Sequence, residues 1–226
     1  MLLNLLILQV ILGALTGTVG VAIDGAGKPT FTIHEDSAWD RIAWSKELES
    51  RITDADAVYF GTLGQRADIS RHTIRKCIET AIAAGVPRVV DINLRPPFFD
   101  SVMIRESIRL ASILKLSDDE LNAVCDACNI CSNDQPNAML RQLIDTQGLE
   151  LVVMTRGEQG AVLATRGDVI EQPGIPTIVH DTVGAGDSFT AAFLLGLLRG
   201  ESHDQNLFKA CSIAATVCSH AGAIPT

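Results

Sequence analysis

The sequence predicts an α/β fold in which a mostly parallel central sheet is covered by helices on both faces. From about Asp54 onward, short apolar runs alternate with amphipathic helical segments, an order typical of parallel sheets. Before them, at about 16–35, alternating apolar and polar residues predict a β-hairpin. The 226 residues are 47% hydrophobic and 20% charged, which is enough apolar material for a large core.

The hairpin is the first predicted element after the apolar start of the chain. Val19, Val21 and Ile23 alternate with small or polar residues, and Gly25–Gly27 supplies a turn. Phe31 alternates with threonines on the second strand. This pattern predicts a sheet that is covered on one side only.

The α/β part begins with a short apolar strand at Ala57–Gly61. Ser70 is predicted to cap the next helix, which Gly85 and Pro87 end. Ser188–Leu198 is apolar on nearly every side, so we expect a buried helix there. The other predicted elements are strands at 88–93, 113–116 and 151–155, helices at 102–112, 118–128 and 137–146, and an antiparallel excursion at 161–179.

The composition narrows the partners and the location of the chain. Nucleic acids and anionic membranes attract basic surfaces, whereas the formal net charge here is −9, so neither is expected as a partner. Six cysteines are too few for a disulfide scaffold in a chain of this length, and no Asn-x-Ser/Thr site occurs. These features favour a reducing, cytoplasmic location.

Three cysteines have the spacing with which some iron–sulfur ligand sets begin, Cys125, Cys128 and Cys131. The fourth cysteine that would precede a proline is absent, because Gln135 stands before Pro136. We therefore expect three small apolar residues on a helix surface.

The first fifteen residues, MLLNLLILQVILGAL, are unusually apolar. The run is shorter than the ~20 residues of a membrane span and is interrupted by Asn4, Gln9 and Gly13. A secretory signal begins with basic residues, whereas the first basic residue here is Lys28. A buried strand or helix, or an aberrant start, is favoured, and a signal or membrane role stays open.

Polar residues follow the predicted strands at the edge where an open parallel sheet binds its ligands. Groups suited to phosphate, a cation and a proton meet there. They are Asp91, Asn93, Arg95, Lys115, Glu120, Thr155, Gly157, Gly160, Asp181 and Asp187.

The strongest motif is DTVGAGD at 181–187, directly before the predicted buried helix. Gly184, Ala185 and Gly186 have little or no side chain, so their N–H groups can approach an anion at the helix N-terminus. Asp187 in the first turn is placed to take a proton from a hydroxyl that attacks phosphorus. The alternative is an ordinary helix start that Asp187 caps.

The other motifs are weaker one by one. The turn at 155–160 could hold nucleotide phosphates through Thr155 and backbone N–H groups, or it could be an ordinary tight turn. Glu120 could bind Mg²⁺ through water or simply favour the first turn of its helix. Arg95 could hold a phosphoryl group or form a surface ion pair. No P-loop motif occurs.

Taken together, these motifs resemble those of the ribokinase-like (PfkB) carbohydrate kinases. The matching stretches are DTVGAGDSFTAAFLLGLL at 181–198, DINLR at 91–95, KLSDDE at 115–120, TRGEQG at 155–160 and HAGA at 220–223. The hairpin and the AWD at 38–40 resemble the fructokinase branch. The resemblance implies a ribokinase-like α/β/α sandwich with a mostly parallel central sheet and a small β-sheet lid. It implies one kinase domain over 1–226, with a lid hairpin at about 16–35 and an α/β core at about 54–226.

The resemblance also implies the roles of the site residues. Asp187 would be the catalytic base, and Gly184, Ala185 and Gly186 the anion hole. ATP would contact Lys115, Thr155, Gly157 and Gly160, and the substrate or its phosphate would lie near Asp91, Asn93 and Arg95. Glu120 would hold Mg²⁺ through water, and Asp181 with the backbone near Gly222 would hold a monovalent cation such as K⁺. The partner would be a small-molecule sugar, with a homodimer formed through the lid sheet.

Two departures from the family pattern bear on activity. Ser117 stands where the family motif N-x-x-E has asparagine. Nothing before Thr16 matches the family's N-terminal segment, which supplies the first strands, an acidic sugar-binding residue and a Gly-Gly motif. We therefore expect an N-terminally incomplete chain. Two functions stay open: an ATP-dependent sugar kinase, with fructose favoured, or a truncated non-catalytic fragment or paralogue that retains nucleotide binding only.

Overall fold

The fold is described from a computed structural model of the chain, over residues 11–23, 29–130 and 135–224. Three sequence predictions concern residues outside these ranges. They are the apolar stretch at 1–10, the hairpin turn at Gly25–Gly27 and the position of Cys131.

A six-stranded sheet forms the centre of the molecule, in the order β3-β4-β5-β6-β7-β8. Strands β3 to β6 are parallel, whereas β7 and β8 pair antiparallel at one edge. This arrangement confirms the predicted fold class, including the antiparallel excursion. The bounds are β3 Val58–Gly61, β4 Arg88–Asp91, β5 Ile113–Ser117, β6 Leu151–Thr155, β7 Ala161–Thr165 and β8 Val169–Gln172.

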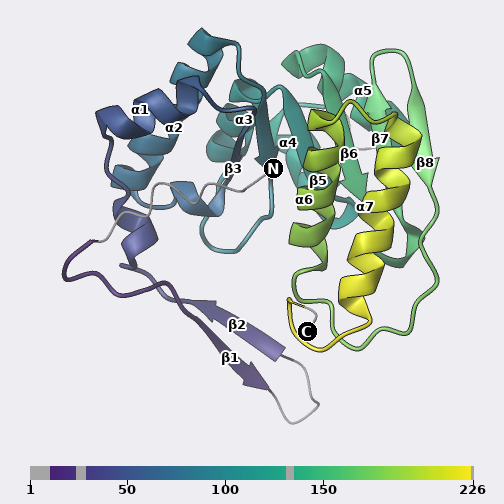
Figure 1. Ribbon diagram of the computed structural model, residues 1–226, viewed down its shortest axis with the longest axis horizontal. Coiled ribbons are helices and arrows are strands. Elements are labelled where there is room, and N and C mark those ends of the chain that lie inside the picture. The colour runs from purple at the N-terminus through teal and green to yellow at the C-terminus, as the bar shows by residue number, and fades with distance from the viewer. Residues whose placement is uncertain (1–10, 24–28, 131–134, 225–226) are drawn as a thin grey trace.

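Helices cover both faces of this sheet (Figure 1). Successive residues of a strand point to opposite faces of the sheet. Val90 packs in the core that contains α2 to α5, and Val89 packs in the core that contains α6 and α7. The near-continuous apolar strands follow from this double burial. The helices are α1 Lys46–Thr53, α2 Asp68–Ala84, α3 Ser101–Leu110, α4 Asp118–Ala127, α5 Pro136–Gln147, α6 Ala185–Leu198 and α7 His203–Cys218.

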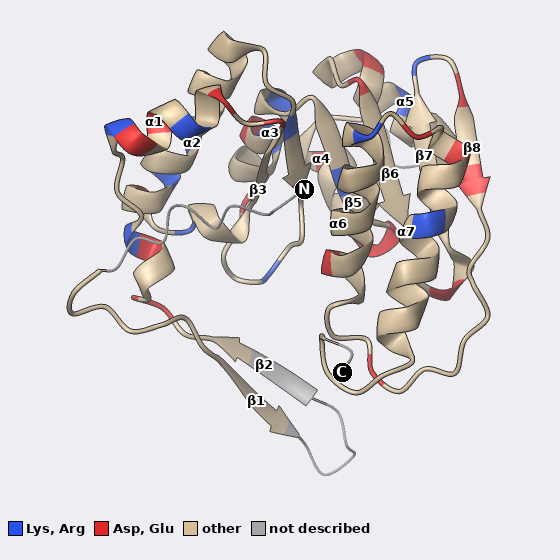
Figure 2. Cartoon of the chain, in the orientation of Figure 1, with Lys and Arg blue, Asp and Glu red and all other residues tan. Residues whose placement is uncertain are grey.

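A separate two-stranded antiparallel sheet, here called the lid sheet, consists of β1 Val19–Ile23 and β2 Pro29–Ile33. It projects below the ends of the parallel strands (Figure 1). The sequences of both strands contain no Asp, Glu, Lys or Arg, and Figure 2 shows none in the part of the lid sheet that is drawn in tan. Val19 and Val21 are 52% and 58% exposed, so one apolar face of the lid sheet is open to solvent.

Several local predictions were wrong in detail. Ser70 is not a cap: α2 begins at Asp68, and the Ser70 hydroxyl donates to the carbonyl of Trp39. Helix α6 begins at Ala185 and is buried on one side only, with Leu198 42% exposed, because α7 and the sheet cover a single face. Cys125 and Cys128 lie in the core rather than on a helix surface, and burial raises the pKa of each thiol, to about 12 and about 11.

Two helices, α1 and α7, were not predicted from the sequence. Among the helices of the described residues, none combines the length and the apolar character needed to cross a membrane.

Arg66 joins the lid side of the molecule to the core. Its guanidinium donates two hydrogen bonds of 2.7 Å to the Asp40 carboxylate and a third to the carbonyl of His34. The same group lies 4.7 Å from the ring centre of Trp39 and 4.8 Å from that of Phe98. Both ion-pair side chains are more than nine-tenths buried, so the pair connects the segment after β2 with the segment after β3, and the ring of Phe98 adds the loop after β4.

We expect the Asp40–Arg66 pair to make stability depend on pH in the acid range. The hydrogen bonds from Arg66 lower the pKa of Asp40 below its ordinary value of 3.8, against the effect of burial. Because its pKa is lowered on folding, the ionised Asp40 carboxylate stabilises the folded state at pH values above its ordinary pKa. This contribution is lost as the pH falls through the lowered pKa. Asp40→Asn is expected to cost about 3 kcal/mol at pH 7, because Arg66 is left buried and unpaired. Urea unfolding between pH 7 and pH 2.5 measures both effects.

The matched control for this prediction is Asp36→Asn. Asp36 pairs with Arg41 on the surface of the same segment, where ion pairs contribute little to stability. Below about pH 4 the difference between wild type and Asp40→Asn is expected to shrink, while Asp36→Asn stays close to wild type throughout. A difference that is constant with pH would show that Asp40 does not titrate through its ion pair.

Candidate active site

The site is centred on the N-terminus of α6, below which the lid sheet projects (Figure 1). Gly184 is the N-cap and has φ +81°, a left-handed conformation that favours glycine. A Cβ at Gly184 would lie 2.9 Å from the Cβ of Ala223, so the turn packs closely against the segment at 220–223. Gly186 and Asp187 in the first turn are exposed, so their backbone N–H groups and the Asp187 carboxylate are accessible.

A pocket of about 830 Å³ lies beside this helix N-terminus. One wall is the turn at 155–160, and another is the first turn of α6 with Ala185 and Gly186. The third wall is apolar, from Ile175 to Val179 and from the face of α7 that carries Ala215 and Cys218. A pocket of this size, apolar on one side and lined on the other by small residues at the N-terminus of a helix, suits a nucleotide.

The turn at 155–160 is shaped by its glycines. Gly160 has φ +91° and ψ −132°, and a Cβ there would lie 2.0 Å from the carbonyl oxygen of Gln172. Gly157 has φ +54° with open space around it. Thr155 and both glycines line the pocket, while the Thr155 hydroxyl is directed to the carbonyl of Leu116 at 3.5 Å. Packing therefore requires glycine at position 160, whether or not this residue contacts a ligand.

Asp91 and Lys115 form a buried ion pair behind the first turns of α6. Lys115 Nζ donates to Asp91 Oδ1 at 3.0 Å, and both side chains are less than a tenth exposed. The Thr190 hydroxyl lies 3.3 Å from Asp91 Oδ2 and 2.9 Å from the carbonyl of Gly186. Burial raises the pKa of Asp91, and the Lys115 ammonium opposes this shift. Neither residue is among those that line the pocket.

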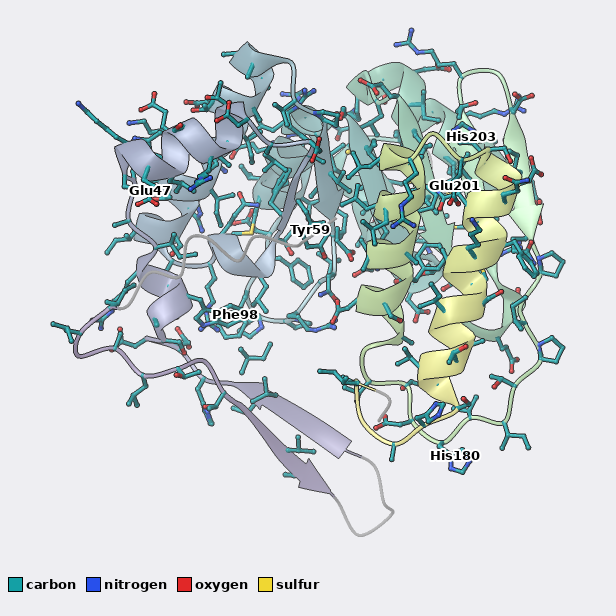
Figure 3. All side chains as sticks on the ribbon, in the orientation of Figure 1. Glu47, Tyr59, Phe98, His180, Glu201 and His203 are labelled. Atoms are coloured by element: carbon teal, nitrogen blue, oxygen red, sulfur yellow. The ribbon has the colours of Figure 1, made fainter. Side chains whose placement is uncertain are left out.

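Tyr59 is a further candidate residue, which the sequence analysis did not identify. Its hydroxyl donates to Asp91 Oδ2 at 3.3 Å. Although the residue as a whole is 48% exposed, desolvation of its hydroxyl raises the pKa above its usual range, and the negative charges of Asp91 and Asp187 raise it further. Figure 3 shows Tyr59 between β3 and α6, with Phe98 below it. The phenol therefore lies within electrostatic reach of the proposed base.

Glu120 anchors the loop that follows β4. Its Oε1 accepts from the backbone N–H of Leu94 at 2.6 Å, and its Oε2 accepts from that of Ser117 at 2.8 Å. Ser117 and Glu120 form a capping box at the start of α4, so serine fulfils a cap role where the family has asparagine. In the same loop Asn93 has φ +41°, and Arg95 is exposed, with its guanidinium donating to the carbonyl of Leu94.

Asp181 ties the motif to the end of the chain. Its Oδ1 accepts from the N–H of Val183 at 3.0 Å and its Oδ2 from that of Gly222 at 3.0 Å. These hydrogen bonds lower the pKa of Asp181. The HAGA segment at 220–223 therefore belongs structurally to the DTVGAGD turn.

The structure thus separates the candidate residues into groups. The pocket brings together Thr155, Gly157, Gly160, Ala185 and Gly186. Asp91 and Lys115 lie behind α6, whereas Asn93, Arg95 and Glu120 lie on the loop after β4 or hold it. Sequence reasoning missed Tyr59, Thr190 and the apolar wall from α7. An apolar stripe at helical spacing, Leu207, Ala210, Cys211 and Ala214, was the available signal for α7.

An α/β/α sandwich with a small lid sheet defines the ribokinase-like class of fold. A fructokinase from Xylella fastidiosa, solved with bound ATP, has this fold: it superimposes with a TM-score of 0.80 at 20% identity, over 94% of this chain and 70% of that one. The family model described as pfkB family carbohydrate kinase matches residues 7–226, so the chain belongs to this family.

Curated relatives in this family are kinases of different sugars. The chain is 30% identical over 198 residues to a 2-dehydro-3-deoxygalactonokinase of Haloferax volcanii, covering 84% of this chain and 60% of that protein. It is 28% identical over 220 residues to a fructokinase of Klebsiella pneumoniae, covering 91% and 69%. The chain spans about three fifths of the length of several relatives.

Proposed function

We propose that this protein transfers the γ-phosphate of ATP to a hydroxyl group of a sugar, with fructose as the first sugar to test. One observation carries the proposal: the exposed N-terminus of α6, with Asp187 in its first turn, opens on a pocket large enough for a nucleotide. Membership of the pfkB family and the kinases among the relatives support it. The relatives act on different sugars, so fructose rests on the resemblance of the hairpin region and on the fructokinase relatives.

In the proposed mechanism, each part of the site has one task. The apolar wall of α7 and the turn at 155–160 hold the base and phosphates of ATP. The N–H groups at the start of α6 stabilise the charge that develops on the transferring phosphoryl group. The Asp187 carboxylate takes the proton of the attacking sugar hydroxyl. Asn93 and Arg95, on the loop that Glu120 holds, flank the phosphate.

Magnesium would neutralise charge on the phosphates when it is bound with ATP. Glu120 fits a contact through water rather than direct ligation, because each of its oxygens already accepts one backbone N–H. Among the described residues, no three His, Cys, Asp or Glu side chains group as a metal site. A monovalent cation such as K⁺ would share the remaining lone pairs of Asp181 and nearby carbonyl oxygens.

We expect Ala215→Trp to weaken ATP binding at least tenfold. Ala215 lies on the pocket wall formed by α7, so an indole there would occupy space that the adenine ring needs. Calorimetric titration with ATP and Mg²⁺ measures the affinity directly. The same titration tests nucleotide binding in the wild-type chain.

The matched control is Ile213→Trp, on the same helix but 46% exposed to solvent. It is expected to bind ATP within about threefold of wild type, which corresponds to about 0.65 kcal/mol. If both variants bind equally well, the nucleotide does not use this pocket. ATP binding without fructose-dependent ADP release would instead favour the non-catalytic alternative.

A further inference from the structure

The Lys115–Asp91 pair is aligned with α6 in a definite direction. A Cβ built on Gly186 would lie 3.8 Å from Lys115 Nζ, so the ammonium group lies against the first turn of the helix. Asp91 contacts Thr190, one turn further along the same helix. The positive end of the pair therefore points toward the N-terminus of α6 and the negative end points away from it.

This direction matches that of the helix dipole, whose positive end is at the N-terminus. Both contributions raise the electrostatic potential where an anion would bind at Gly184–Gly186. The pair is shielded from water, with side-chain exposures of 8% for Lys115 and 2% for Asp91, so its field is weakly screened. Thr190 adds a contact between the pair and α6, since its one hydroxyl proton is shared between Asp91 Oδ2 and the carbonyl of Gly186.

We propose that Lys115 is a positioning residue that raises the positive potential of the anion hole from behind α6, rather than a nucleotide ligand as its sequence motif suggested. Asp91 holds the ammonium in this orientation, and the Thr190 hydroxyl contacts Asp91 from α6. The inference rests on the proposed phosphoryl transfer. It states that a buried ion pair assists this transfer electrostatically. Its effect grows as charge accumulates on the transferring group.

The test compares the double variant Asp91→Asn/Lys115→Met with wild type. Changing both residues leaves no unpaired buried charge, so the fold is preserved better than in Lys115→Met alone. Two affinities are measured by calorimetry in the presence of Mg²⁺ and fructose: that for ATP in a non-hydrolysable form, and that for ADP with aluminium fluoride, which mimics the transferring group. Thermal unfolding reports whether the variant is folded.

We expect the double variant to lose about tenfold or more in affinity for ADP with aluminium fluoride, and less than threefold for the ATP analogue. kcat should fall by a similar factor, with the KM for ATP nearly unchanged. Equal losses for both ligands would overturn the inference, because they would indicate a direct nucleotide contact. Unchanged affinities with a lower unfolding temperature would also overturn it, because the pair would then be structural only.

The control is Glu201→Gln/Lys209→Met, which neutralises an ion pair near the start of α7, beyond the C-terminal end of α6 and so at the opposite end of that helix from the anion hole. It is expected to leave both affinities unchanged. A wild-type chain that releases no ADP with fructose would contradict the proposed function. The two affinities would still decide the inference, since they measure the potential of the anion hole and not turnover.

Discussion

Asp187→Asn is expected to reduce fructose-dependent turnover by about 10²- to 10⁴-fold, while the affinity for ATP stays near that of wild type. The asparagine keeps the size of the side chain and the start of α6, but it removes the proton acceptor. General-base catalysis typically contributes this range, so kcat should fall without a matching change in KM for ATP. A coupled assay of ADP release and a calorimetric titration measure the two quantities.

The matched control is Asp204→Asn, because Asp204 lies in the first turn of α7, as Asp187 lies in the first turn of α6. It separates the loss of a carboxylate at a helix N-terminus from the loss of a base. Asp204→Asn should retain turnover within threefold. Turnover of Asp187→Asn within the same threefold would remove Asp187 from the role of base.

Gly160→Ala is expected to have the largest effect on stability. The residue has φ +91° and ψ −132°, which side-chain-bearing residues rarely adopt, and strain of this kind costs about 1–3 kcal/mol. In addition, the new Cβ would lie 2.0 Å from the carbonyl oxygen of Gln172, so the backbone at 172–174 must move. We expect a loss of about 4 kcal/mol or more in the free energy of unfolding, measured with urea.

Two other glycines calibrate this prediction. Gly157→Ala, in the same turn, meets no atom within 4 Å and has φ +54°, so it should cost only about 1 kcal/mol. Gly167→Ala also meets no atom within 4 Å and has no positive φ, so it should be nearly neutral. Similar losses for Gly160 and Gly157 would mean that the segment at 172–174 yields easily.

The two largest effects address different parts of the candidate site, since Gly160 lines the pocket and Asp187 lies beside it in the first turn of α6. Asp187 is exposed at the start of α6, so its replacement acts on chemistry and not on packing. Gly160 is buried where the turn at 155–160 meets the segment that follows β8, so its replacement acts on the shape of the pocket wall. A variant at Gly160 that stays folded should therefore lose ATP affinity, which Asp187→Asn should not.

The sequence by itself determined the order and type of most elements. The strands of the parallel sheet and the helices from α2 to α5 are strongly periodic or capped, and these signals lie within a few residues of one another. The anion-binding turn was also readable, because its glycines and Asp187 are consecutive and directly precede an apolar helix. At these places the neighbouring residues in the sequence were sufficient to predict the structure.

Only the tertiary structure decided the environment of each candidate residue. Lys115 and Asp91 are 24 positions apart, and Asp91 and Thr190 are 99 apart, so nothing local predicts their network. In the anion-binding turn the positive φ occurs at Gly184 and not at Gly186, and Gly184 is where the segment carrying Ala223 packs against the turn. Arg66 similarly gains its role from Asp40, Trp39 and Phe98, which come from two distant segments. Burial and pairing depend on which surfaces meet, and that is fixed only when the layers pack.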